Sequence, residues 1–106
     1  MTFTIPRADW VSDDLAAERG EHAGFEMFSR EANDAVAQMI IDVTTEAETK
    51  MLLRGAIIER LQQGVAEVRK TYPEVGDTEP EWRIVDVMNL WLDQNGFRNI
   101  GRDDLS

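Results

Sequence analysis

The apolar and polar residues of this chain alternate with the period of an α-helix over most of its length. One apolar stripe recurs at steps of three and four residues, which predicts a helix over about residues 25–43. The stripe consists of Phe25, Phe28, Ala32, Ala35, Val36, Met39, Ile40 and Val43. Because Thr44 and Thr45 are β-branched and polar, we expect the helix to end there.

A second long stripe predicts a helix over about residues 46–72. Its members are Leu53, Ile57, Leu61, Val65, Val68 and Tyr72. The pattern Thr45-x-x-Glu48 is typical of a capping box at a helix start, and Pro73 does not allow the helix to continue. Gly55 and Gly64 lie inside this helix, where a glycine indicates a bend or the close approach of another backbone.

Two shorter helices complete the pattern. Ser12 is a good N-cap for a helix over about residues 13–19, which should end near Gly20. The second runs over about residues 79–95, with Pro80 in its first turn. Its capping signals are Thr78-x-x-Glu81 at the start and Asn95-Gly96 at the end, and its inward face holds Ile84, Val85, Met88, Trp91 and Leu92.

These elements predict an all-α protein, a compact bundle of four to five helices with antiparallel neighbours. We expect one helical domain over residues 1–106, with an extended lead over 1–8. The tail over 97–106 should place Phe97 and Ile100 on the core and then fray. The antiparallel arrangement follows because the predicted connections are short. They lie near residues 20–24, 44–45 and 73–79.

Composition narrows the class of protein. At 42% hydrophobic residues the chain is too apolar for intrinsic disorder, and its lack of cysteine excludes a disulfide scaffold and a thiolate metal site. The first ten residues lack the features of a signal peptide, and no apolar run reaches the length of a membrane span. We therefore expect a cytoplasmic protein with no membrane partner.

Catalytic chemistry is not indicated by any residue pattern. His22 is the only imidazole, and the chain contains no phosphate-binding loop, nucleophile elbow or zinc-protease motif. An enzyme needs positioned groups with tuned pKa values. We therefore expect a protein that is not an enzyme and uses neither a cofactor nor a metal.

Charge is the strongest pointer to a partner. The chain has 21 Asp and Glu residues against 11 Lys and Arg residues, a formal net charge of −10. Some acids have ordinary roles at helix starts, as Asp13 and Asp14 do. An acidic surface also suits docking on a basic protein, where carboxylates replace phosphates. The candidate carboxylates are Asp9, Asp13, Asp14, Glu18, Glu21 and Glu26 near the start, and Glu74, Asp77, Glu79, Glu81 and Asp86 around the later loop.

Residues 50–70 reverse this balance, with five bases against two acids. The bases are Lys50, Arg54, Arg60, Arg69 and Lys70. In one interpretation Lys50 and Arg54 extend their charges away from the end of the core, and in the other they form a small basic site for single-stranded nucleic acid. The bases are dispersed around the helix rather than forming one stripe, and the net charge repels phosphate.

Three tryptophans differ in their expected roles. Trp82 and Trp91 are nine positions apart on one helix and so lie on nearly opposite faces. Trp91 falls in the apolar stripe and should be buried, whereas Trp82 is a candidate exposed anchor for a partner. Trp10 precedes the first helix and is expected to pack against it.

In length, acidic cysteine-free composition, helical pattern and lack of catalytic motifs, the chain resembles the small anti-CRISPR proteins of phages and mobile elements, in particular inhibitors of type I-E systems from Pseudomonas. The resemblance implies an inhibitor, active in the bacterial host cell, of a type I CRISPR-Cas system. Such an inhibitor would bind the crRNA-guided surveillance complex, its nuclease-helicase, or the nucleic acid held there. The alternatives are a phage structural or adaptor protein and an antitoxin-like acidic protein-binding module.

Overall fold

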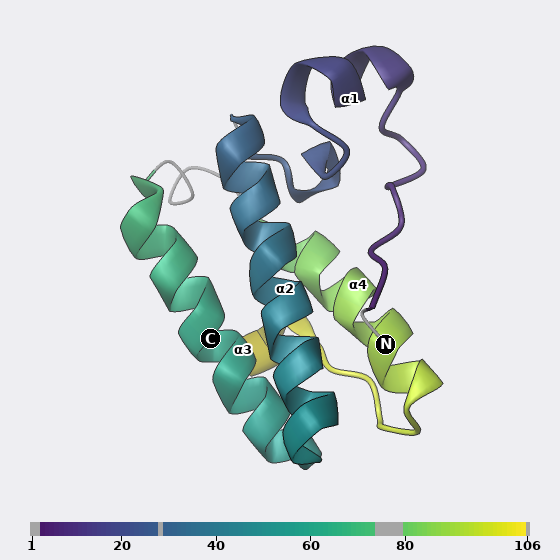
Figure 1. The fold of residues 1–106 in the computed structure, drawn as a ribbon, viewed down its shortest axis with the longest axis vertical. Coiled ribbons are helices and arrows are strands. Elements are labelled where there is room, and N and C mark those ends of the chain that lie inside the picture. The colour runs from purple at the N-terminus through teal and green to yellow at the C-terminus, as the bar shows by residue number, and fades with distance from the viewer. Residues whose placement is uncertain (1–2, 28, 74–79, 106) are drawn as a thin grey trace.

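Helices make up most of the structure, a computed structural model that describes residues 3–27, 29–73 and 80–105. The elements follow the chain as α1 (Asp13–Arg19), η1 (Ala23–Phe25), α2 (Arg30–Lys50), α3 (Arg54–Thr71), α4 (Glu81–Gln94) and η3 (Arg102–Leu105), where η denotes a 3-10 helix (Figure 1). The described residues include no strand. The predicted all-α bundle is confirmed.

The helices α2 and α3 form an antiparallel hairpin that spans the long axis of the molecule (Figure 1). They meet closely at Gly64, where an added Cβ would lie 2.5 Å from Met39 Cγ. The close neighbour of Gly64 is thus the side chain of Met39 rather than the backbone of another helix that the sequence indicated. No such contact surrounds Gly55, where an added Cβ would meet nothing within 4 Å.

The predicted break at Thr44 and Thr45 is wrong, because α2 continues through both residues to Lys50. The Thr44 hydroxyl is buried and donates to the carbonyl oxygen of Ile40 at 2.9 Å, so the helix itself satisfies the polar group. Thr45 and Glu48 consequently lie inside α2 and form no capping box.

The chain turns instead at residues 51–53. Met51 takes a left-handed backbone conformation with φ 53°, and α3 begins at Arg54 without a side-chain cap. Met51 and Leu53 are among the most exposed apolar residues of the described chain. Because apolar residues usually mark helix interiors, local sequence gave no signal for a turn at this point.

The start of α2 also differs from the prediction. Ser29 caps the helix by accepting a hydrogen bond from the Ala32 amide at 3.1 Å, so α2 begins at Arg30 rather than near residue 25. Phe25 is buried within η1. Phe28, which the stripe included, lies outside the described residues.

Asn33 joins the α1–η1 region to α2. Its side chain is fully buried, and its Oδ1 accepts from the Met27 amide at 3.1 Å. Its Nδ2 donates to the carbonyl oxygens of Arg19 at 3.2 Å and Met27 at 3.3 Å. One amide therefore satisfies backbone groups at two points of the segment that precedes α2.

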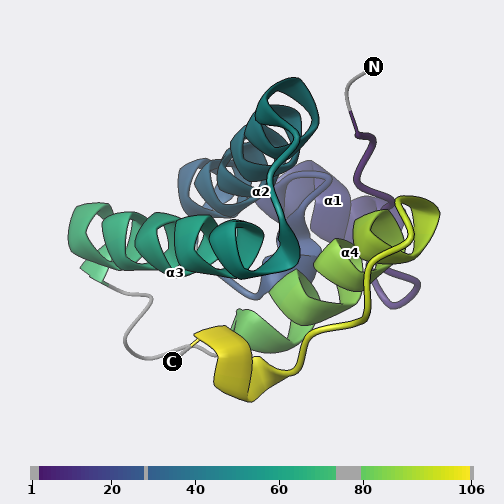
Figure 2. The same ribbon diagram turned by 90° about the horizontal axis from the view of Figure 1, so that it is seen from below.

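The remaining helices and the tail close the core. Figure 2 shows α4 running obliquely to the hairpin, and η3 contacts both α3 and α4. Trp91 is buried as predicted, and its Nε1 donates to Glu48 Oε1 at 3.0 Å. Phe97 stacks on the Trp91 ring with centroids 5.9 Å apart.

The tail does not fray within the described residues, because side chains of the helices hold its backbone. Asn89 exchanges two hydrogen bonds with the backbone of Ile100, at 2.8 and 3.1 Å. Gln62 donates to the carbonyl oxygen of Asp104 at 2.8 Å, and Leu105 is buried. In the described part of the chain, no helix combines the length and apolar character that crossing a bilayer requires.

Replacement of Asn33 by alanine should lower the free energy of unfolding by about 2–3 kcal/mol, because the backbone of Met27 and the carbonyl oxygen of Arg19 lose their hydrogen bonds to the buried amide. Urea denaturation followed by circular dichroism measures this change. The control is Gln38→Ala, which removes an exposed hydrogen bond to Asp42 and should change stability by less than about 0.5 kcal/mol. Equal effects of the two variants would contradict the anchoring role of Asn33.

The two glycines of α3 should respond oppositely to alanine. Gly55→Ala should raise the free energy of unfolding by about 0.5–1 kcal/mol, because alanine favours the helix and the space is open. Gly64→Ala should lower it by about 1 kcal/mol, because Met39 must move. Thermal and urea denaturation measure both, and equal stabilisation would show that Met39 yields without cost.

Candidate protein-binding site

Trp10 and Trp82 are both more than half exposed, with 56% and 59% of their surface accessible. They flank a hollow of about 360 Å³, which we call the tryptophan hollow. Its lining consists of Ala8, Asp9, Trp10, Gly24, Glu26, Trp82, Arg83 and Asp86. The exposure of Trp82 agrees with the prediction, whereas Trp10 does not bury its ring against α1 as expected.

Three segments distant in the sequence build the hollow: the turn before α1, the helix η1 with the residue after it, and the first two turns of α4. The turn closes by a hydrogen bond from the Val11 amide to the Ala8 carbonyl oxygen at 3.0 Å. Gly24 packs so tightly on this turn that an added Cβ would lie 2.8 Å from Ala8 Cβ. Arg83 joins α4 to the lead by donating to the Pro6 carbonyl oxygen at 2.6 Å.

Carboxylates dominate the charge of the hollow. Asp9, Glu26 and Asp86 are exposed, and none of them forms a salt bridge with another described residue. Arg83 is the only cation in the lining that the structure describes. Three carboxylates and one guanidinium give the hollow a formal charge of −2, which favours a cationic ligand.

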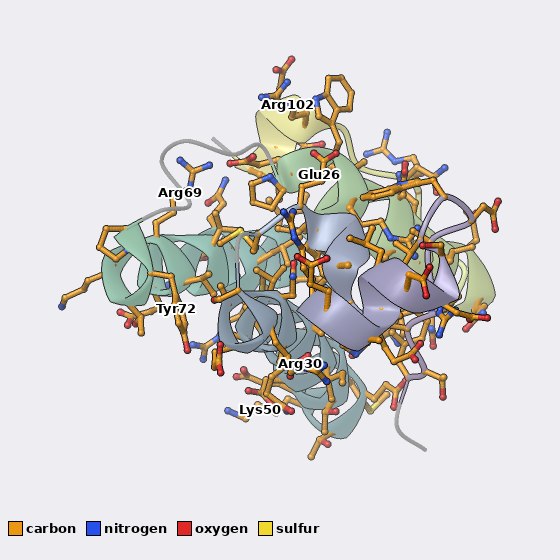
Figure 3. The ribbon with its side chains drawn as sticks, turned by 90° about the horizontal axis from the view of Figure 1, so that it is seen from above. Glu26, Arg30, Lys50, Arg69, Tyr72 and Arg102 are labelled. Carbon is orange, nitrogen blue, oxygen red and sulfur yellow. The ribbon has the colours of Figure 1, made fainter. Side chains whose placement is uncertain are left out.

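The ring of Trp82 already holds a cation on one side. The guanidinium carbon of Arg102 lies 4.7 Å from the ring centroid, within the range of a cation–π interaction. Figure 3 shows Arg102 and Glu26 on the same side of the molecule. The tail therefore contributes to the surroundings of the hollow through Arg102, although η3 does not line it.

The other acids proposed near the N-terminus divide into two groups. Asp13 and Glu21 both pair with Arg7, at 2.7 Å each, so that one guanidinium compensates much of their charge. Asp14 and Glu18 are exposed on α1 and belong to no salt bridge among the described residues.

Carboxylates around the later loop are less available. Glu81 is buried and forms a salt bridge with Arg69, so it lies apart from the exposed acidic set. Glu74, Asp77 and Glu79 lie outside the described residues. Asp86 is the member of this group that reaches the tryptophan hollow.

The proposed basic residues do not form one surface. Glu46 accepts from both Lys50 at 3.1 Å and Arg60 at 2.9 Å, and Arg69 pairs with Glu81. Lys50 and Arg69 lie on different sides of the molecule (Figure 3). Lys70 is exposed and has no salt bridge within the described chain.

Arg54 differs from the other bases because its partners are neutral. Its guanidinium donates to the carbonyl oxygens of Arg98 at 3.1 Å and Asn99 at 2.7 Å. These bonds hold the tail against the start of α3 and leave the charge of Arg54 uncompensated by any described carboxylate. They also bring Arg98, which is exposed, close to Arg54.

Two further hollows are larger than the tryptophan hollow. One, of about 480 Å³, surrounds the Arg69–Glu81 salt bridge, and the other, of about 460 Å³, lies along the groove between α2 and α3. No aromatic side chain of the described residues lines either of them. The tryptophan hollow is therefore the strongest candidate for recognition, since exposed aromatic rings are enriched at protein interfaces.

Of the lining residues, Asp9, Glu26, Trp82 and Asp86 were predicted from the sequence to bind a partner, but not as one hollow. Trp10 was not predicted as a site residue, and the contacts of Gly24 and Arg83 were not predicted. A glycine at a tight contact and an arginine bonded to a distant carbonyl have no local sequence signal.

Among the described residues, no group of three or more histidine, cysteine, aspartate or glutamate side chains is arranged to hold a metal ion. Comparison of the chain with protein-family models, curated proteins and solved structures finds no significant match.

The pairing of Arg7 with Glu21 leads to a prediction about the pKa of the Glu21 carboxyl. Its hydrogen bonds lower the pKa of the Glu21 carboxyl below the ordinary value. Because the pKa is lowered in the folded state, the stabilisation from this pair is present above the ordinary pKa of glutamate and is lost as the pH falls through the folded value. Carbon-detected NMR titration should show the Glu21 pKa rising in Arg7→Met. The control Arg98→Met should leave it lowered, and an unchanged Glu21 pKa in Arg7→Met would contradict the pairing.

Proposed function

We propose that this protein acts by binding, without catalysis, and that the tryptophan hollow with its carboxylates docks on a basic protein surface. Within that class, we propose an inhibitor of a type I CRISPR-Cas system in the cytoplasm of a bacterial host. The partner is a basic component of the crRNA-guided surveillance complex or its nuclease-helicase. The resemblance to small acidic anti-CRISPR proteins supports this finer assignment.

One observation carries the proposal: two tryptophans expose more than half of their surface at the rim of an acidic hollow. Exposing a large aromatic ring to water is unfavourable, and tryptophan is strongly enriched among the residues that dominate binding energy at interfaces. A hollow between such rings suits a projecting side chain of a partner.

The distribution of charge supports a basic partner. Asp9, Asp14, Glu18, Glu26 and Asp86 are exposed, and no described salt bridge neutralises them. Unpaired carboxylates of this kind raise the association rate with a positively charged surface and disfavour acidic competitors. Proteins that hold RNA or DNA carry such positive surfaces, so an acidic protein is suited to occupy them.

A second candidate function is favoured by a separate observation. The Arg54 guanidinium donates to the carbonyl oxygens of Arg98 and Asn99, and no described carboxylate neutralises its charge. Arg54 and the exposed Arg98, whose backbone Arg54 contacts, would be the residues that bind a single-stranded nucleic acid in the surveillance complex. The net charge of −10 opposes this mode, so we rank it second.

Charge reversal tests the first candidate. The triple variant Asp9→Lys, Glu26→Lys and Asp86→Lys should lose at least tenfold in affinity for the partner, because the hollow becomes positive. A pull-down from the bacterial host measures binding, and plasmid interference measures inhibition. The matched control, Asp42→Lys with Glu59→Lys and Glu67→Lys, changes the net charge equally on α2 and α3 and should retain both activities.

Other outcomes separate the alternatives. If the triple variant still binds and inhibits, the acidic docking mode is wrong. A salt-sensitive gel shift of single-stranded DNA by the wild type, lost in Arg54→Glu with Arg98→Glu, would establish the second candidate instead. Co-purification with phage particles without any effect on interference would indicate a structural or adaptor protein, and capture with a toxin would indicate an antitoxin-like module.

A further inference from the structure

We infer that the tryptophan hollow binds a single arginine side chain of the partner, held between the two indole rings and the carboxylates. This inference rests on the proposed function, because it assumes a basic protein as partner. It adds the chemical identity of the group that is recognised. The size of the hollow agrees with a ligand of this kind, since about 360 Å³ is near the lower end of the range for small-ligand pockets.

The lining matches the two properties that distinguish arginine from other side chains. A guanidinium is flat and weakly hydrated, so it stacks on an indole more readily than the compact, strongly hydrated ammonium of lysine. It also presents several N–H donors in a fixed plane, and Asp9, Glu26 and Asp86 offer carboxylate acceptors around the hollow. A lysine side chain would pair with the carboxylates but would stack less well on the indole rings.

The molecule itself shows that one of these rings accepts a guanidinium. The guanidinium carbon of Arg102 lies over the Trp82 ring at 4.7 Å from the ring centroid, so it occupies one side of the indole. A flat aromatic ring has two faces, both of which carry the negative charge that attracts cations. The Trp82 ring therefore contacts the guanidinium of Arg102 and also lines the hollow.

The walls of the hollow are held before any ligand arrives. The tight contact of Gly24 with Ala8 fixes η1 against the lead, and the hydrogen bond from Arg83 to Pro6 fixes α4 against the same segment. A preformed site loses little conformational freedom on binding. Arg83 opposes an incoming cation, but its guanidinium is directed to the Pro6 carbonyl oxygen and three carboxylates outnumber it.

The test uses short capped peptides of glycine and serine that contain one arginine, one lysine or one citrulline. Titration of the full-length protein at about 0.15 M salt is followed by the indole Nε1–H signals in NMR spectra. The arginine peptide should shift the signals of Trp10 and Trp82 and leave that of Trp91, which is buried, unchanged. The lysine peptide should bind about fivefold more weakly, and the neutral citrulline peptide should produce no shift.

Variants complete the test. Trp10→Leu and Trp82→Leu should each weaken the arginine peptide at least fivefold, whereas Leu90→Ala, a change at an exposed apolar residue of α4 that does not line the hollow, should leave binding unchanged. Equal binding of arginine and lysine, or shifts that survive both tryptophan variants, would overturn the inference. So would a short single-stranded DNA that shifts the same two indoles more strongly than the arginine peptide.

The two proposals fail separately. If the host partner is captured by the wild type and lost by the triple charge variant, but the arginine peptide produces no shift, the pocket assignment is wrong and the proposed function stands. If the arginine peptide binds as described but no basic CRISPR-Cas component is captured, the pocket assignment stands and the proposed function is wrong.

Discussion

The buried amide of Asn33 is the polar contact that supports the proposed recognition surface. Its hydrogen bonds to Arg19 and Met27 join the α1–η1 segment to α2, beside Phe25 and Met27, which are buried in the same core. η1 in turn supplies Gly24, on which the N-terminal turn with Trp10 packs. A polar side chain inside a helix thus determines the geometry of a hollow on the surface, because it sets the position of one of the walls.

The salt bridges of the folded chain decide which of its charged side chains stay unpaired, which the composition alone does not reveal. Arg7 compensates two acids near α1, and Glu46 and Glu81 bind bases that the sequence placed in a basic segment. These contacts leave a smaller set of exposed carboxylates whose charge is free to act on a partner. The exposed pairs among these contacts, which do not include the pair of Arg69 with buried Glu81, contribute little to stability, so their main effect is to decide where the field of the protein is concentrated.

The helical faces, both ends of α1 and the C-terminal ends of α3 and α4 could be predicted from the sequence, but the start of α2, the turn between α2 and α3, and the site could not. Periodicity identified the buried face that contains Ile40, Leu61 and Trp91, because burial repeats with the helical period. It misplaced the turn at Thr44, since a threonine hydroxyl can bond within its own helix and a turn at Met51 has no local signal. The site joins residues from opposite parts of the chain, and such proximity arises only after packing.

Binding at the hollow, as we propose it, would also depend on the first and last segments of the described chain. Trp10 belongs to the segment that follows the lead, Trp82 belongs to α4, and Arg102 on the tail rests against Trp82. A ligand seated between the rings would clamp the beginning of the chain to its last helix, and its binding energy would add to the free energy of keeping that segment folded. With a ligand bound, the proposed site would therefore hold the N-terminal segment and α4 together, so that binding would also stabilise the fold.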